Sequence, residues 1–319
     1  MPTIAILGAT GIQGGSVVRQ LEKSSTWKIR ALTRNVESAK AQTLASRGVE
    51  VVSADVNYEE SLVKAFEGVD AVFAVTTFWD SLVNLGQDGS GQEEFQQLKN
   101  LANAARKTTT LNHYILSSLP PAGKASQGKL KVPHFDYKQR AVDWMRETTP
   151  DLFCKTSQIW PGWYHTNLTK IPGRFLEIPN TDGAYIWAQP SKQSACLPIA
   201  GDIDYNFGVV VKGLLDAGPK AFGKIAICVT DYMPFTDVVK VFGEITGCRA
   251  AYAELSDDSI FKLFGIFGAE YAAQLRWSEE FPSWESISPK DVISLEALGV
   301  ERELVDFASA MEAIKNQII

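Results

Sequence analysis

Short apolar segments alternate with amphipathic segments along the first half of the chain, and this alternation predicts an α/β fold. The apolar segments are typical of buried strands, because apolar residues occur on both of their faces. They lie at residues 3–7, 28–33, 49–55, 70–77, 113–118 and 151–157. The segments with helical spacing lie at residues 14–23, 38–48, 57–68, 93–107 and 133–147. This order predicts a Rossmann-like, doubly wound parallel sheet with helices on both faces.

The pattern loosens after residue 157. Residues 158–200 are rich in glycine, proline and tryptophan, and we interpret them as loops that surround a binding partner or ligand of unspecified kind. A helix at 204–218 and a strand at 224–229 follow, and the remainder is expected to be mostly helical. The predicted domains are a dinucleotide-binding Rossmann domain at 1–157, with returning segments at 201–230, and a smaller C-terminal substrate or partner lobe at 158–200 and 231–319.

Composition narrows the classes of partner. The chain has 319 residues, of which 45% are apolar and 21% charged, and its net charge is −6. An acidic balance argues against nucleic-acid binding through phosphates and against attraction to a membrane surface. The four cysteines are scattered singly, so no metal site is predicted. Because such thiols suit a reducing compartment and no apolar run could span a bilayer, we expect a cytoplasmic protein.

The stretch "GATGIQGG", residues 8–15, carries the clearest chemical signal. Gly8, Gly11 and Gly14 recur every third residue between the first predicted strand and the first predicted helix. Glycine permits the tight turn and the close approach of backbone to a pyrophosphate, and the helix N-terminus then offers free N–H groups to the anion. The pattern therefore favours dinucleotide binding over a merely tight turn.

The end of the second strand bears on the choice of dinucleotide. NAD sites often have an acidic residue there for the ribose hydroxyls, whereas this chain has Thr33 and Arg34. A guanidinium suits a 2′-phosphate, and Lys40 on the next helix adds a second positive charge. NADP(H) is therefore preferred over NAD(H), although Arg34 would also suit a solvated surface. Asp55, after the third strand, is placed either to meet the adenine or to start the next helix.

Three stretches resemble the NmrA-like family, a branch of the atypical short-chain dehydrogenase/reductases. They are "GATGIQGGSV", "VTTFWDS" and, most specifically, "PHFDYK". The resemblance runs from Met1 into the C-terminal helices and implies a Rossmann domain, a small C-terminal lobe and a cofactor cleft between them. It implies two functions: an NADP(H)-dependent reductase of small molecules, or a non-catalytic NADP(H)-binding redox sensor that acts through a protein partner.

The resemblance also implies roles for individual residues. Lys138 would face the nicotinamide ribose, and Thr76 and Thr77 would line the cofactor at the carboxyl edge of the sheet. The phosphate loop would be carried by Gly8, Thr10, Gly11, Gln13 and Gly14.

The predicted catalytic group departs from the usual pattern of short-chain reductases. Their Tyr-x-x-x-Lys pair has His134 in place of the tyrosine here, four residues before Lys138 and on the same helix face. Histidine is a capable acid or base near neutral pH, although a structural histidine is an equally open interpretation. Ser117 ends the fifth strand, where such reductases often place a substrate-orienting serine; capping the following loop is the alternative.

Aromatic residues near the carboxyl edge are candidates for a substrate pocket. The stretch "WPGWYHTNL", residues 160–168, contributes Trp163, Tyr164 and His165, and the "VTTFWDS" stretch contributes Trp79. These side chains would wall a pocket or pack between the lobes, and Tyr164 or His165 is a reserve proton donor. We expect an NADP(H)-dependent oxidoreductase that moves hydride between nicotinamide and a small carbonyl-bearing or unsaturated substrate, with the redox sensor as alternative.

Overall fold

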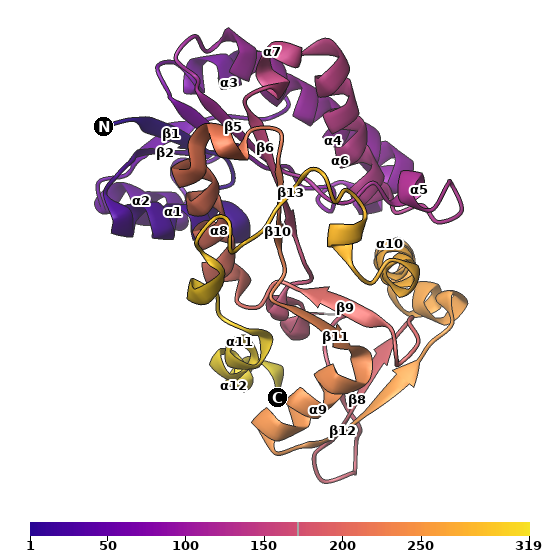
Figure 1. The fold of residues 1–319 in the computed structure, drawn as a ribbon. Coiled ribbons are helices and arrows are strands. Elements are labelled where there is room, and N and C mark those ends of the chain that lie inside the picture. Colours follow the sequence, from indigo (N-terminus) through magenta and orange to yellow (C-terminus); the bar gives the residue numbers. More distant parts are fainter. Residues whose placement is uncertain (171) are drawn as a thin grey trace.

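An eight-stranded parallel sheet forms the centre of the molecule in the computed structural model, which describes residues 1–170 and 172–319 (Figure 1). The strand order is β13-β10-β6-β5-β4-β1-β2-β3. This order confirms the predicted Rossmann-like fold, because strands β1 to β6 follow the doubly wound order 3-2-1-4-5-6. The strands are β1 Thr3–Ile6, β2 Lys28–Thr33, β3 Glu50–Ser53, β4 Ala71–Ala74, β5 His113–Ser117, β6 Thr156–Pro161, β10 Ile225–Cys228 and β13 Val292–Ile293.

Helices cover both faces of this sheet (Figure 1). One face packs against α1 (Ile12–Ser24) and α8 (Ile203–Ala217). These two helices approach so closely that a Cβ at Gly208 would lie 2.2 Å from the Ser16 carbonyl oxygen. The helices α3, α4 and α6 cover the other face. The remaining bounds in this part are α2 Ala39–Ser46, α3 Glu59–Ala65, α4 Leu82–Lys107, α5 Ala122–Ala125, α6 Pro133–Thr148 and α7 Pro150–Phe153.

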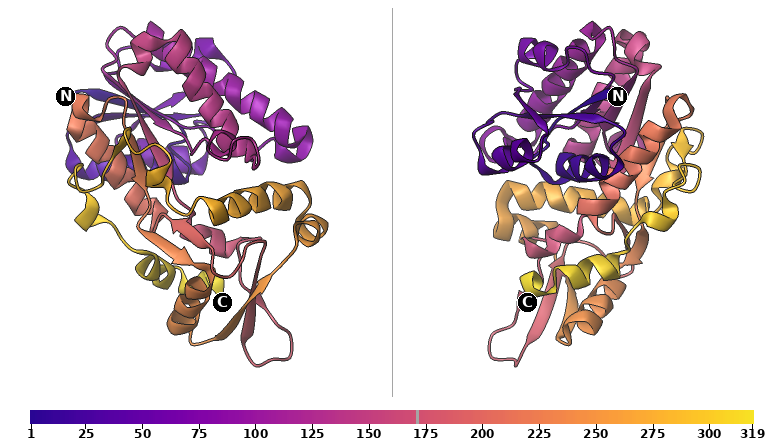
Figure 2. Two further views of the ribbon diagram at one scale, coloured as in Figure 1. Left: turned by 45° about the vertical axis from the view of Figure 1, so that its right-hand side comes forward. Right: turned by 90° about the vertical axis from the view of Figure 1, so that its left-hand side faces the viewer.

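A smaller lobe lies beside one edge of the sheet domain (Figure 2). Its core is aromatic, with Trp163, Trp187 and Phe235 buried together. Its strands form two small sheets: β7 (Leu176–Glu177), β8 (Ala184–Gln189) and β12 (Arg249–Glu254) in one, β9 (Cys196–Ile199) and β11 (Asp231–Pro234) in the other. Its helices are α9 Phe235–Thr246, α10 Asp257–Glu280, α11 Phe307–Ala313 and α12 Lys315–Ile318. Short 3₁₀ turns lie at His165–Thr169, Gly218–Ala221, Trp284–Ser286 and Glu301–Glu303.

The predicted strand at 151–157 is wrong. Residues Pro150–Phe153 form the short helix α7, and the sixth strand begins only at Thr156. Pro150 suits a first helical turn because it has no N–H to donate, and Leu152 buries itself completely from that turn. The strand then continues to Pro161, into the range assigned above to the lobe.

Residues after 230 are less helical than expected. They include β11, β12 and β13, and β13 pairs in parallel with β10 at the edge of the large sheet. The two-residue strand β13 is too short to show a period, so its pairing follows from the fold rather than from local pattern. Within the described part of the chain, no helix has the length and apolar character needed to cross a membrane.

Candidate functional site

The glycine loop joins β1 to α1 in the conformation that its glycines allow. Gly8 has φ +61°, in the left-handed region, and its carbonyl oxygen accepts a 2.8 Å hydrogen bond from the Gly11 N–H. A Cβ at Gly14 would lie 2.4 Å from the carbonyl oxygens of Leu7 and Gly8, so only glycine lets α1 start so close to β1. The first turn of α1 contains no acidic residue, which leaves its N-terminus open to an anion.

A tyrosine of the lobe reaches this loop. The Gln13 Nε2 donates to the Tyr164 hydroxyl at 2.5 Å, across 151 residues of sequence. Burial raises the pKa of Tyr164 to about 12, although the hydrogen bond from Gln13 opposes that rise. Tyr164 is therefore a neutral phenol that joins the lobe to the loop. Nearby, Lys40 Nζ donates to the Thr10 carbonyl oxygen at 3.3 Å.

Charged residues lie in the segments that follow β2, β3 and β4. The Arg34 guanidinium lies 3.6 Å from the Asp80 carboxylate, and both side chains are exposed. The Thr77 hydroxyl also donates to Asp80, at 3.3 Å. Asp55 Oδ1 accepts the Asn57 N–H at 2.9 Å, so this carboxylate is engaged in the turn before α3. Lys40 thus contacts the glycine loop, whereas Arg34, the other predicted cation, is paired with Asp80.

Lys138 lies at the point where the order of the strands reverses. Between β1 and β4 the chain passes from one half of the sheet to the other, and open α/β sheets bind ligands at such points. Thr76 follows β4 there, and Lys138 Nζ donates to its hydroxyl oxygen at 3.1 Å. Lys138 is only 7% exposed, so it is not a solvated helix lysine.

The partner of Lys138 is Glu94 on α4, which the sequence analysis missed. The Glu94 Oε1 accepts from Lys138 Nζ at 2.6 Å and from the Thr76 hydroxyl at 2.8 Å. Glu94 is fully buried, and its Oε2 has no hydrogen-bond partner among the described residues. The sequence does contain a sign of this buried carboxylate, because Glu94 shares one helix face with the buried Leu98 and Leu101. A carboxylate on the buried face of a helix requires a partner.

His134 is held by a second buried carboxylate. The Glu270 Oε1 lies 2.5 Å from His134 Nδ1 and accepts the His134 backbone N–H at 2.9 Å, while Gln87 donates to Oε2 at 2.6 Å. Burial alone would raise the pKa of Glu270, but its hydrogen bonds and the charge of His134 outweigh burial and lower it. The carboxylate is therefore ionised, and His134 Nδ1 is the donor. The Gln274 Oε1 lies 3.2 Å from Nε2.

The partnership of Glu270 with His134 could not be predicted from the spacing of residues along the sequence. Glu270 lies on α10 of the lobe, 136 residues from His134, and reaches it only through the tertiary fold. The contact shows that the lobe supplies part of the surroundings of α6. His134 and Lys138 share one helix face as predicted, each with a buried glutamate beside it.

Trp79 packs against both His134 and Phe267 of the lobe. Its ring centroid lies 4.9 Å from that of His134 and 4.8 Å from that of Phe267 on α10. The side chain is half-buried, so it is available to wall a pocket. Trp163 differs, because it is buried in the core of the lobe and its Nε1 donates to the Tyr271 hydroxyl at 3.3 Å. Trp163 therefore packs in the core of the lobe, which is the alternative to lining a substrate pocket.

Ser117 and its neighbour lie at the carboxyl end of β5. Ser117 is the last residue of that strand and is buried, beside Ile159 of β6. The Ser118 hydroxyl donates to Gln158 at 2.8 Å and accepts from Trp160 Nε1 at 3.0 Å, which gives Ser118 a structural role.

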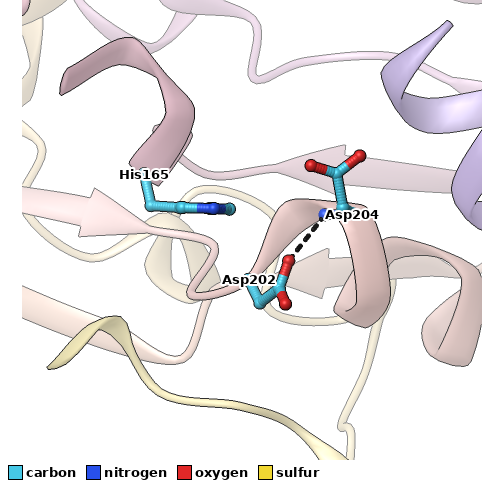
Figure 3. A group of neighbouring side chains, drawn as sticks. All are labelled: His165, Asp202 and Asp204. Carbon is cyan, nitrogen blue, oxygen red and sulfur yellow. Dashed lines mark hydrogen bonds between the residues drawn. The ribbon is translucent and has the colours of Figure 1, made fainter. Parts of the chain in front are cut away.

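His165 lies in a small cluster with Asp202 and Asp204 (Figure 3). Its Nδ1 lies 3.0 Å from the Gly201 carbonyl oxygen, and burial lowers the pKa of His165 although both aspartates raise it. Asp202 caps α8 through the Asp204 N–H at 3.0 Å, and Asp204 pairs with Arg19 at 3.0 Å. Each member already has a partner in the chain, so the cluster is satisfied without an ion.

The fold and the glycine loop define a Rossmann-like protein, and comparison with known proteins gives its family. The chain belongs to the NmrA-like family, whose model matches residues 1–299. A relative from Aspergillus campestris, the NmrA-like family domain-containing oxidoreductase cpsB, is 28% identical over 266 residues, which cover 81% of this chain and 77% of the relative.

Solved structures share the fold. The structure of NmrA, a negative transcriptional regulator, matches with a TM-score of 0.79 at 22% identity and covers 99% of this chain and 96% of that one. The Citrobacter sp. triphenylmethane reductase complexed with NADP(H) matches with a TM-score of 0.71 at 19% identity and covers 99% and 100% of the two chains. At these identities the likeness concerns the fold.

Proposed function

We propose that this protein is an NADP(H)-dependent oxidoreductase that transfers hydride between nicotinamide and a small carbonyl-bearing or unsaturated substrate. One observation carries the proposal. Lys138, buried at the point where the strand order reverses, is within hydrogen-bonding distance of Thr76 and Glu94, and it shares a helix face with His134. A buried cation beside a histidine at this edge suits the binding and orientation of a nicotinamide ribose.

The residues around the glycine loop fit a dinucleotide. Gly14 keeps α1 against β1, so that the N–H groups at its N-terminus face the loop. Arg34 and Lys40 supply two positive charges for a 2′-phosphate. A related fold, that of triphenylmethane reductase, is known with NADP(H) bound. The cofactor, when bound, supplies or accepts the hydride.

The protein contributes orientation and a proton. Lys138 and Thr76 position the ribose, with Glu94 holding the lysine in place. His134 is the first candidate for the proton donor: in the protonated imidazolium, the Nδ1–H stays bonded to Glu270, and the Nε2–H, which lies toward Gln274, is the proton that can be transferred. Ser117 is a candidate to orient the substrate, and Trp79 to wall its pocket. Tyr164 and His165 remain reserve donors.

Binding and turnover test the proposal separately. Wild-type protein is titrated with NADPH and NADH by calorimetry, and Arg34→Ala is expected to lose about 10- to 100-fold in NADPH affinity while NADH affinity stays nearly unchanged. Equal affinity of the wild type for the two cofactors would contradict the preference for NADP(H).

Turnover is then followed by reduced-nicotinamide absorbance, with NADPH and a panel of ketones, enones, imines and quinones. Oxidation of NADPH with any of these, lost in Lys138→Ala, supports the enzyme. No oxidation across the panel, together with a protein partner whose binding differs between NADP⁺ and NADPH, would replace it with the redox sensor.

A further inference from the structure

The Arg34–Asp80 ion pair joins the segments that follow β2 and β4, on either side of the strand that leads into the glycine loop. Arg34 follows β2, whereas Asp80 lies between β4 and α4, and β1 with its glycine loop stands between those strands. Two strand spacings, about 10 Å, separate β2 from β4. The guanidinium nevertheless lies 3.6 Å from the Asp80 carboxylate. The ion pair therefore spans the edge of the sheet from which the glycine loop emerges.

Both members of this pair are accessible to a ligand. The side chains are 70% and 56% exposed, so solvent screens the pair and a stronger anion can displace the carboxylate. Thr77 donates to Asp80 Oδ1 at 3.3 Å, which turns the carboxylate back toward its own loop. A 2′-phosphate carries more charge than a carboxylate and accepts a bidentate contact from arginine.

We propose that Asp80 is a specificity-determining residue, whose carboxylate competes with the 2′-phosphate of NADP(H) for Arg34 and so reduces the preference for NADP(H) over NAD(H). The proposal rests on the proposed function, because it takes Arg34 as the phosphate ligand. NAD(H) has a hydroxyl group at the same position and leaves the ion pair intact. Asp80 therefore weakens the binding of one cofactor and not of the other.

The size of the effect follows from the exposure of the pair. Interactions between exposed charges change a binding constant by up to about fivefold, so Asp80→Asn is expected to tighten NADPH binding about 3- to 5-fold. NADH affinity should stay within about twofold. The gain should shrink as salt is raised from about 0.05 M to about 0.5 M, because salt screens exposed charges.

The test is a double-mutant cycle on cofactor binding that needs no turnover. Dissociation constants for NADPH and NADH are measured by titration calorimetry in the wild type, Asp80→Asn, Arg34→Ala and the double variant. Most of the gain from Asp80→Asn should vanish in the Arg34→Ala background. Asp143→Asn is the matched control, since it removes an exposed aspartate paired with Arg146 at 3.3 Å on α6. It should change neither affinity.

Three results would overturn the inference: an unchanged NADPH-to-NADH ratio in Asp80→Asn, a weaker NADPH affinity in that variant, or an equal gain with and without Arg34. The second would mean that the carboxylate orients Arg34 for the phosphate. If the wild type binds neither dinucleotide, the proposed function fails, and this inference fails with it.

Discussion

The Glu94 carboxylate lies 2.6 Å from the Lys138 ammonium, and neither side chain is more than 9% exposed. A buried charge that loses its partner is destabilising by about 3–5 kcal/mol, whereas replacement of both charges by neutral groups is often harmless. Lys138→Met is therefore expected to lower the free energy of unfolding by about 3 kcal/mol or more, measured by urea denaturation. Lys138→Met/Glu94→Gln should recover most of that loss.

A more exposed ion pair, between α3 and α4, is the control. Lys107 lies 2.6 Å from Glu59, with side chains 59% and 29% exposed, so Lys107→Met should cost less than about 1 kcal/mol. A loss in Lys138→Met no larger than in Lys107→Met would show that Glu94 is not left as an isolated buried charge.

The glycine loop gives a prediction on binding. Gly11→Val places a branched side chain where the pyrophosphate is expected, and its Cβ would lie 3.2 Å from the Gly8 carbonyl oxygen. NADPH and NADH binding should both be lost while the circular dichroism spectrum stays native. Gly243→Val is the matched control, because its Cβ would lie 3.3 Å from the Cys248 carbonyl oxygen, in the lobe. Binding at wild-type strength in Gly11→Val would refute the phosphate-loop assignment.

The local sequence pattern predicted the sheet domain well, because a strand, a helix or a turn is indicated by apolar spacing and turn residues within a short stretch of the chain. The second strand, 28–33, and the glycine loop are examples. The strand predicted at 151–157 failed where Pro150 starts a helical turn within an apolar run. Glu270, Asp80 and the Gln13–Tyr164 contact depend on segments that meet only in the folded chain. Spacing along one sequence carries no information on such contacts.

Acid should destabilise the protein partly through His113. Burial lowers the pKa of this histidine from its ordinary value of 6.5 to about 4, and its Nε2 lies 2.8 Å from the Ser157 hydroxyl oxygen. Between pH 6.5 and 4 the unfolded chain binds the proton more readily than the folded one, so stability falls as pH falls through that window.

Urea denaturation at pH 7 and pH 5 measures this contribution. The wild type should lose about 2 kcal/mol more than His113→Gln over that interval, since the glutamine amide keeps a donor for Ser157 but does not titrate. Equal losses of unfolding free energy in the two proteins would show that the acid sensitivity comes from groups other than His113.

The last prediction concerns the proton donor. His134→Phe should lower turnover about 10²- to 10⁴-fold and leave NADPH affinity little changed, because the imidazole acts on the substrate and not on the cofactor. Glu270→Gln should lower kcat less and leave KM nearly unchanged, since the carboxylate acts on the reaction through His134, whose Nδ1 it holds at 2.5 Å.

The two substitutions must then be non-additive. Added to His134→Phe, Glu270→Gln should have little further effect on kcat, because the group that it positions is already gone. A second drop equal to the first would show that Glu270 serves another group, such as Gln87, whose Nε2 it binds at 2.6 Å. Full activity of His134→Phe would move the proton donor to Tyr164, His165 or water, and would leave the His134–Glu270 contact as a structural link between α6 and α10.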